Sequence, residues 1–170
     1  MKILLVTLLH PLPTNAATGT FEADHAQLLR DMGHDVRIVN PLPRLLKYME
    51  QSRSTLTGVA KAPKQFEHNE FEIFAPRYVA YTDHPYPWLT SRSIRNRQRS
   101  IEKWLSGWRP DHIIAHTLWP VGELARSLSI RWKGLGLVLF TAMMLMLGSR
   151  IKRLGNVSSR SWNPPSRWSS

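Results

Sequence analysis

The sequence predicts an α/β fold built on a doubly wound, parallel β-sheet. Three observations indicate this fold: short apolar runs of strand length, amphipathic stretches of helix length, and the alternation of the two from Met1 to about Ile130. A chain of 170 residues also suits one ordinary domain. Ligands of such sheets bind at the carboxyl ends of the strands, so functional residues are expected there.

The start of the chain predicts one βαβ unit. Lys2 to Leu9 is a continuous Leu-rich run, as expected of a strand buried on both faces of a parallel sheet. A small-residue loop with Gly19 follows, and apolar residues then recur at helical spacing from Phe21 to Met32. Gly33 ends this helix, and Asp35 to Pro41 is predicted to be the second strand.

The middle of the chain is less regular. Leu42 to Lys64 is interpreted as a long, partly helical connection, Glu70 to Tyr81 as a strand with its exit, and Asp83 to Trp88 as a turn. Ser91 to Trp108 is predicted to form a single helix with apolar residues on one side and arginines on the other. The arginines are interpreted as a solvated face, and contact with anionic lipid is the alternative.

A second strand-to-helix segment follows. Asp111 to His116 is a buried-strand run, and Trp119 to Gly122 leads into a helix from Glu123 to Leu128. Because the carboxyl ends of parallel strands lie at one edge of a sheet, Leu9 to Thr20 and Ala115 to Gly122 are expected to line one crevice.

Composition excludes several classes of protein. The absence of Cys excludes a disulfide scaffold, a Cys-ligated zinc site and a thiol nucleophile. No metal is expected either, because the sequence has no cluster of His, Asp and Glu at ligand spacing. A hydrophobic content of 42% and a mean hydropathy of −0.29 exclude a disordered chain and a multi-span membrane protein. The opening segment is no signal peptide, so the predicted location is cytoplasmic. The net charge is +11, yet the chain has no nucleic-acid recognition motif, so nucleic acid is not a favoured partner.

Four segments together form a recurrent pattern: "MKILLVTLLHPLP", "TGTFEADHAQLLRDMGHDVRIVNP", "PDHIIAHTLWPVG" and "ELARSLSI". In this order they resemble the N-terminal half of a GT-B glycosyltransferase of the large retaining family 4. The likeness covers about Met1 to Ile130, although Leu42 to Trp108 matches poorly. It implies that residues 1–133 form a Rossmann-like acceptor-side domain. A second domain would bind the nucleotide-sugar donor, which is a co-substrate; no cofactor is expected in the chain itself.

Substrate binding is expected at Gly19, Thr20, His116 and Trp119. Gly19 allows the backbone to approach a sugar or phosphate, and the N–H groups that open the next helix at Thr20 suit anions. His116 is placed to hydrogen-bond an acceptor hydroxyl or a donor phosphate, and Trp119 offers a stacking face to a sugar ring.

Each candidate also has a structural interpretation. Gly19 suits an ordinary turn, His116 a satisfied structural histidine, and Trp119 packing in the core or between domains. His25 and His34 are interpreted as structural.

The C-terminal part departs from the resemblance. The family continues with a strand and an H-G-x-D motif, whose histidine lies in the active site, but the chain has no such motif, and no catalytic residue is identified. When the codons for Phe140 to Met144 are read two bases later, some choices of synonymous codons encode His-Gly-x-Asp, and every choice encodes its final Asp. We therefore hypothesise that the reading frame slips between about Ile130 and Phe140, which would make residues 134–157 out of frame.

The alternative for this segment is a genuine apolar helix. Gly134 to Gly148 is shorter than the roughly 20 residues that span a bilayer, so it would be a monotopic anchor followed by basic residues. Residues 158–170 are predicted to be disordered.

The sequence therefore predicts the N-terminal fragment of a retaining glycosyltransferase. The fragment would be inactive alone, because catalysis requires both substrates to be held across a cleft. Its partners would be a sugar, glycolipid or other hydroxyl acceptor and a separate or missing donor-binding domain, with peripheral contact to the inner membrane face as a further option. The alternative function is a stand-alone Rossmann-like binding module associated with a membrane or with a partner chain that binds the donor.

Overall fold

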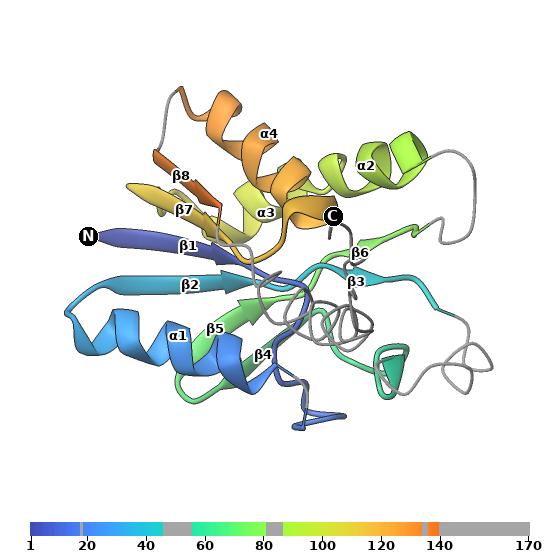
Figure 1. The fold of residues 1–170 in the computed structure, drawn as a ribbon, viewed down its shortest axis with the longest axis horizontal. Coiled ribbons are helices and arrows are strands. Elements are labelled where there is room, and N and C mark those ends of the chain that lie inside the picture. The colour runs from blue at the N-terminus through green and yellow to red at the C-terminus, as the bar shows by residue number, and fades with distance from the viewer. Residues whose placement is uncertain (18, 46–55, 81–86, 134–135, 140–170) are drawn as a thin grey trace, which may run out of the picture.

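The structure is a computed structural model that describes residues 1–17, 19–45, 56–80, 87–133 and 136–139. A six-stranded sheet in the order β4-β5-β2-β1-β7-β8 forms its centre (Figure 1). The strands of this sheet are β1 (Lys2–Val6), β2 (Asp35–Val39), β4 (Gln65–His68), β5 (Phe71–Phe74), β7 (His112–Ala115) and β8 (Gly136–Leu139). All neighbours pair in parallel except β4, which is antiparallel to β5 at the edge. The predicted α/β class with a mostly parallel sheet is therefore confirmed.

Helices cover both faces of this sheet. They are α1 (Thr20–Asp31), α2 (Pro87–Arg95), α3 (Gln98–Leu105) and α4 (Glu123–Arg131). Side chains alternate along β1, so that Leu5 packs toward Ala26 and Leu29 of α1, whereas Leu4 joins the opposite cluster with Ile101 of α3 and Leu128 of α4. Strands buried on both faces explain the uninterrupted apolar runs in the sequence.

The two strand-to-helix segments predicted from the sequence are confirmed. The first strand ends at Val6, earlier than the apolar run that predicted it, and the first helix and the second strand follow as expected. Gly33, with φ +83°, ends α1. Helix α4 runs to Arg131, three residues beyond the predicted Leu128.

The single helix predicted over Ser91 to Trp108 is wrong, because two helices occupy this region. Helix α2 ends at Arg95 and α3 begins at Gln98. Ile94 and Ile101 are fully buried, yet the five residues from Arg95 to Arg99 are all polar or charged. Because no apolar side chain of this connection packs into the core, burial does not favour one continuous helix across it.

The middle region contains strands that the sequence analysis missed. Strand β4 forms a hairpin with β5 through Asn69 and Glu70, which both have positive φ. The connection predicted from Leu42 to Lys64 also begins with β3 (Leu42–Pro43), which pairs with β6 (Arg77–Tyr78) in a separate two-stranded sheet. Of the turn predicted over Asp83 to Trp88, Pro87 and Trp88 instead begin α2, and the rest lies outside the described residues, as do residues 46–55 of the connection.

The sheet continues beyond Lys133. Strand β8 pairs in parallel with β7, with Ala115 opposite Leu139, so these four residues form a strand and not the start of an apolar helix. Residues 140–170, including the basic segment and the predicted disordered tail, lie outside the described residues. Within the part of the chain that is described, no helix is both long and apolar enough to cross a membrane.

Candidate functional site

The candidate site is the region at the carboxyl ends of β1 and β7, where the sequence analysis expects a crevice. Strand β1 lies between β2 and β7, and the chain leaves β1 toward α1 on one face and leaves β7 toward α4 on the other. The two loops therefore separate where the winding of the sheet reverses, which is the usual ligand position in such sheets. The end of β7 and the helix that follows the first segment do meet here, because His116 contacts Phe21 and His25 of α1.

Gly19 begins α1 next to the end of the β1 loop. Its φ is +75°, and a Cβ built on it would lie 2.4 Å from the Leu9 carbonyl oxygen and 2.7 Å from the His10 nitrogen. Both the conformation and the space therefore require glycine. The close approach that the structure contains is to the chain's own backbone, and it brings exposed Thr20 and the first turn of α1 to the edge of the crevice.

His116 follows β7 and is fully buried against α1. Its backbone N–H donates to the Val6 carbonyl, and its Nε2 lies 2.8 Å from Nδ1 of His25. The two imidazole rings are stacked with centroids 4.9 Å apart, and the Phe21 ring lies 6.2 Å from His116. His25 was predicted to be structural, and the structure makes it the residue that fixes the ring of His116.

His10 is a third histidine at this edge, and the sequence analysis did not single it out. It is 1% exposed, its Nδ1 lies 3.2 Å from the Pro11 carbonyl oxygen, and its ring meets that of His68 edge to face. Its Nε2 has no hydrogen-bond partner among the described residues. The position of His10 directly after the apolar run that ends at Leu9 was the available signal.

Burial keeps these histidines neutral at pH 7. It lowers the pKa of His10 to about 4, and the backbone contact with Pro11 opposes the shift. Burial also lowers the pKa of His116 to about 4, with smaller contributions from His25 and His10, and it lowers the pKa of His25. A neutral imidazole has one donor and one acceptor nitrogen, so it can exchange hydrogen bonds with hydroxyl groups.

Glu22 adds a carboxyl group in the first turn of α1. It is 6% exposed, and burial raises its pKa. In its ionised form, a carboxylate at this position also complements the dipole of the helix.

Trp119 lies at the rim of the crevice. It is 48% exposed, and its Nε1 donates to Ser91 Oγ at 3.1 Å, so the core-packing interpretation does not hold. Leu9, Phe21 and Leu118 are exposed to a similar degree, between 46% and 51%. The region therefore combines buried polar side chains with exposed apolar ones.

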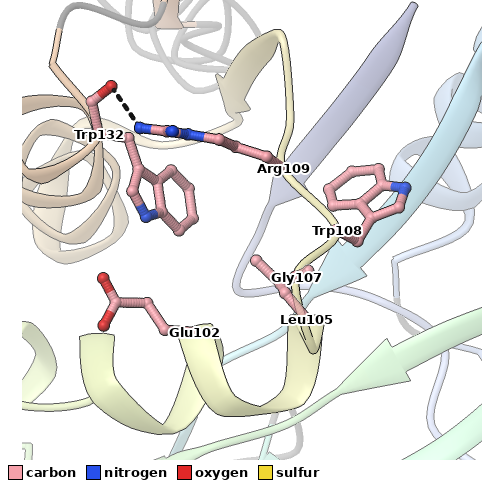
Figure 2. A pocket seen from close by; sticks show the side chains of 6 residues that line it. All are labelled: Glu102, Leu105, Gly107, Trp108, Arg109 and Trp132. Carbon is pink, nitrogen blue, oxygen red and sulfur yellow. Dashed lines mark hydrogen bonds between the residues drawn. The ribbon is translucent and has the colours of Figure 1, made fainter.

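A pocket of about 290 Å³ lies elsewhere, at the amino-terminal edge of the sheet (Figure 2). Its lining residues are Glu102, Leu105, Gly107, Trp108, Arg109 and Trp132. They come from the end of α3, the approach to β7 and the end of α4, and the Arg109 guanidinium donates to the Trp132 carbonyl oxygen. No residue predicted from the sequence to bind substrate lines it.

In the described ranges, no three His, Cys, Asp or Glu side chains are grouped to hold a metal ion. No model of a known protein family matches the chain, and no curated protein shows significant similarity to it. Fold and site together define a class: an α/β protein with a mostly parallel sheet and buried histidines at its carboxyl edge.

Proposed function

We propose that this domain is the acceptor-side half of a retaining GT-B glycosyltransferase of the family 4 type. The observation that carries the proposal is the packing of α1, which begins at Thr20 directly after Gly19, against His116: His25 Nδ1 of this helix lies 2.8 Å from His116 Nε2, although 91 positions separate them in the chain. Gly19, Thr20 and His116 belong to two of the four segments that carry the family resemblance. The order of the five parallel strands, β5-β2-β1-β7-β8, is also the order found in Rossmann-like domains.

The rim of the crevice supports a second domain facing it. Leu9, Phe21, Leu118 and Trp119, in the segments that follow β1 and β7, are each about half exposed. Apolar groups clustered in this way favour a covering partner, here the donor-binding domain. In the reaction, the bond from the anomeric carbon to the donor phosphate breaks and a bond to the acceptor oxygen forms. Neutral His116 is fully buried with its Nε2 against His25, so it would act by holding α1, and with it the exposed Thr20, where the acceptor binds.

The pairing of β8 supports the frame-slip hypothesis in a narrower form. The written frame pairs Gly136 to Leu139 with β7 in the register of a fifth parallel strand. A slip just after this strand would place the shifted His-Gly-x-Asp sequence at the carboxyl end of β8, beside the crevice. Catalysis would then require the protein that is translated in the shifted frame after β8, which we call the repaired chain.

The nucleotide sequence across Arg131 to Ser170 and the following kilobase tests this proposal first. The expected result is a shifted frame that encodes His-Gly-x-Asp and then a second Rossmann-like domain. The repaired protein should release nucleoside diphosphate from a nucleotide sugar. His116→Ala should lower kcat/KM at least about tenfold, and His34→Ala, away from the crevice, should not. A shifted frame that closes at once would overturn the proposal, and a stand-alone binding module would replace it.

A further inference from the structure

Charge is distributed unevenly between two parts of the chain. Residues 1–86 contain nine Lys and Arg and nine Asp and Glu, a net charge of zero. Residues 87–133 contain nine Lys and Arg and three Asp and Glu, a net charge of +6. The second part includes α2, α3 and α4, so the helices on one face of the sheet carry the surplus.

Some of these arginines gather around a hollow. Two pockets, of about 520 Å³ and 430 Å³, share Arg95, Gln98 and Arg131 as lining residues, so they adjoin. We call the two together the arginine groove; the remaining lining residues are Asn96, Arg99, Arg126, Ser127 and Ile130. The groove lies where α2 breaks into α3 against α4, and it is distinct from the crevice.

Acidic side chains neutralise this groove only in part. Glu123 lies 3.7 Å from the Arg95 guanidinium and 3.4 Å from that of Arg126, and Glu102 pairs with Arg131. Arg99 is exposed and makes no ion pair within the described residues. Four guanidinium groups therefore face two carboxylates, which leaves a surplus of two positive charges on a concave surface.

The chemistry of the lining selects a class of ligand. Guanidinium groups bind phosphate oxygens through paired N–H donors, and their planar geometry suits phosphate better than it suits a simple counter-ion. Gln98 donates to Ser127 Oγ across the floor, which adds neutral polar groups between the arginines. Because the larger of the two pockets alone has a volume of about 520 Å³, the groove has room for more than one phosphate group.

We propose that the arginine groove binds a ligand with at least two phosphate groups. Both a soluble phosphorylated molecule and the headgroups of an anionic phospholipid carry this chemistry. The proposal does not depend on glycosyl transfer, because none of the groove residues lines the crevice.

Binding of inorganic tripolyphosphate to the full chain, measured by isothermal titration calorimetry, tests the chemistry. A second arm measures co-sedimentation with phosphatidylglycerol vesicles and with uncharged phosphatidylcholine vesicles. Saturable binding of tripolyphosphate without vesicle binding would assign the groove to a soluble ligand. Binding of the phosphatidylglycerol vesicles alone would assign it to headgroups.

Matched substitutions connect the binding to the groove. Arg99→Gln and Lys103→Gln each remove one positive charge from an exposed position of α3, one turn apart, but only Arg99 lines the groove. Arg99→Gln should weaken binding about tenfold, and Lys103→Gln should leave it within about twofold. Arg126→Gln, from α4, should repeat the loss if Arg99→Gln destabilises the fold. Equal losses in Arg99→Gln and Lys103→Gln, or no saturable binding in either arm, would overturn the proposal.

Discussion

The two edges of the central sheet are built differently. At the amino-terminal edge, polar groups form hydrogen bonds with one another. The Lys2 N–H donates to Asp111 Oδ2, and the Asp111 N–H donates to the Lys2 carbonyl, both at 2.7 Å. Trp108 Nε1 donates to Asp35 Oδ2 at 2.7 Å beside them. At the carboxyl edge, His10 and His116 are buried with lowered pKa values instead.

This difference separates groups that stabilise the fold from groups whose burial costs stability. A hydrogen bond at the exposed amino edge contributes modestly, whereas a buried histidine gives up solvation and part of its hydrogen bonding. Groups with perturbed pKa values concentrate at functional sites more often than elsewhere. Burial of these histidines therefore lowers the stability of the fold at the carboxyl edge, which is where a binding site is expected.

The largest effect is expected from Gly19→Ala at the carboxyl edge. The new Cβ would lie 2.4 Å from the Leu9 carbonyl oxygen at a φ of +75°, so backbone must move. The free energy of unfolding should fall by about 3 kcal/mol or more, measured by urea denaturation. Gly33→Ala is the matched control, since Gly33 also has positive φ (+83°) but has nothing within 4 Å. It should cost only about 1 kcal/mol, and equal costs at both glycines would show that the contact with Leu9 contributes nothing.

The second effect is a loss of stability in acid. The folded state keeps His10 neutral down to about pH 4, whereas its unfolded form takes up a proton below about pH 6.5. The unfolded state therefore binds more protons in this window, and stability, fully present above about pH 6.5, falls as the pH decreases toward 4. His10 alone should account for about 2 to 3 kcal/mol. His116 and His25 act in the same direction, and Glu22, with its raised pKa, acts in the opposite one.

Urea unfolding of the full chain at several pH values between 7 and 4.5 measures this slope. The His10→Gln variant should show a shallower slope, because one titrating group with a lowered pKa is gone. A variant with the same slope as the parent chain would contradict the assignment to His10.

Much of the fold and part of the crevice followed from local sequence. The run from Ile3 to Val6 shows no alternation of apolar and polar residues because all four of its residues are buried in a strand covered on both faces. The break between α2 and α3 was not predicted, since helical periodicity persists from Ile94 to Ile101 across it. Strand β4 was missed because its residues are at most partly buried and lack the apolar signal.

The candidate site was predictable only in its location. The rule for parallel sheets placed Gly19 and His116 at one edge without any knowledge of their contacts. It could not supply the 2.8 Å contact between His25 and His116, because that depends on how α1 packs over the end of β7. Burial of His10 and the convergence of arginines from three helices depend on tertiary packing in the same way.

The smallest effect is expected at the amino edge, from Asp111→Ala. Its carboxylate accepts a hydrogen bond from the Lys2 N–H at an exposed position, where water can replace the lost partner. The free energy of unfolding should therefore fall by about 1 kcal/mol or less, and nucleotide-sugar or phosphate binding should be unchanged. The backbone hydrogen bond from the Asp111 N–H to the Lys2 carbonyl remains in the variant and holds β1 in place. A loss as large as that of Gly19→Ala would mean that the two edges contribute to stability in the same way, and the contrast between them would not hold.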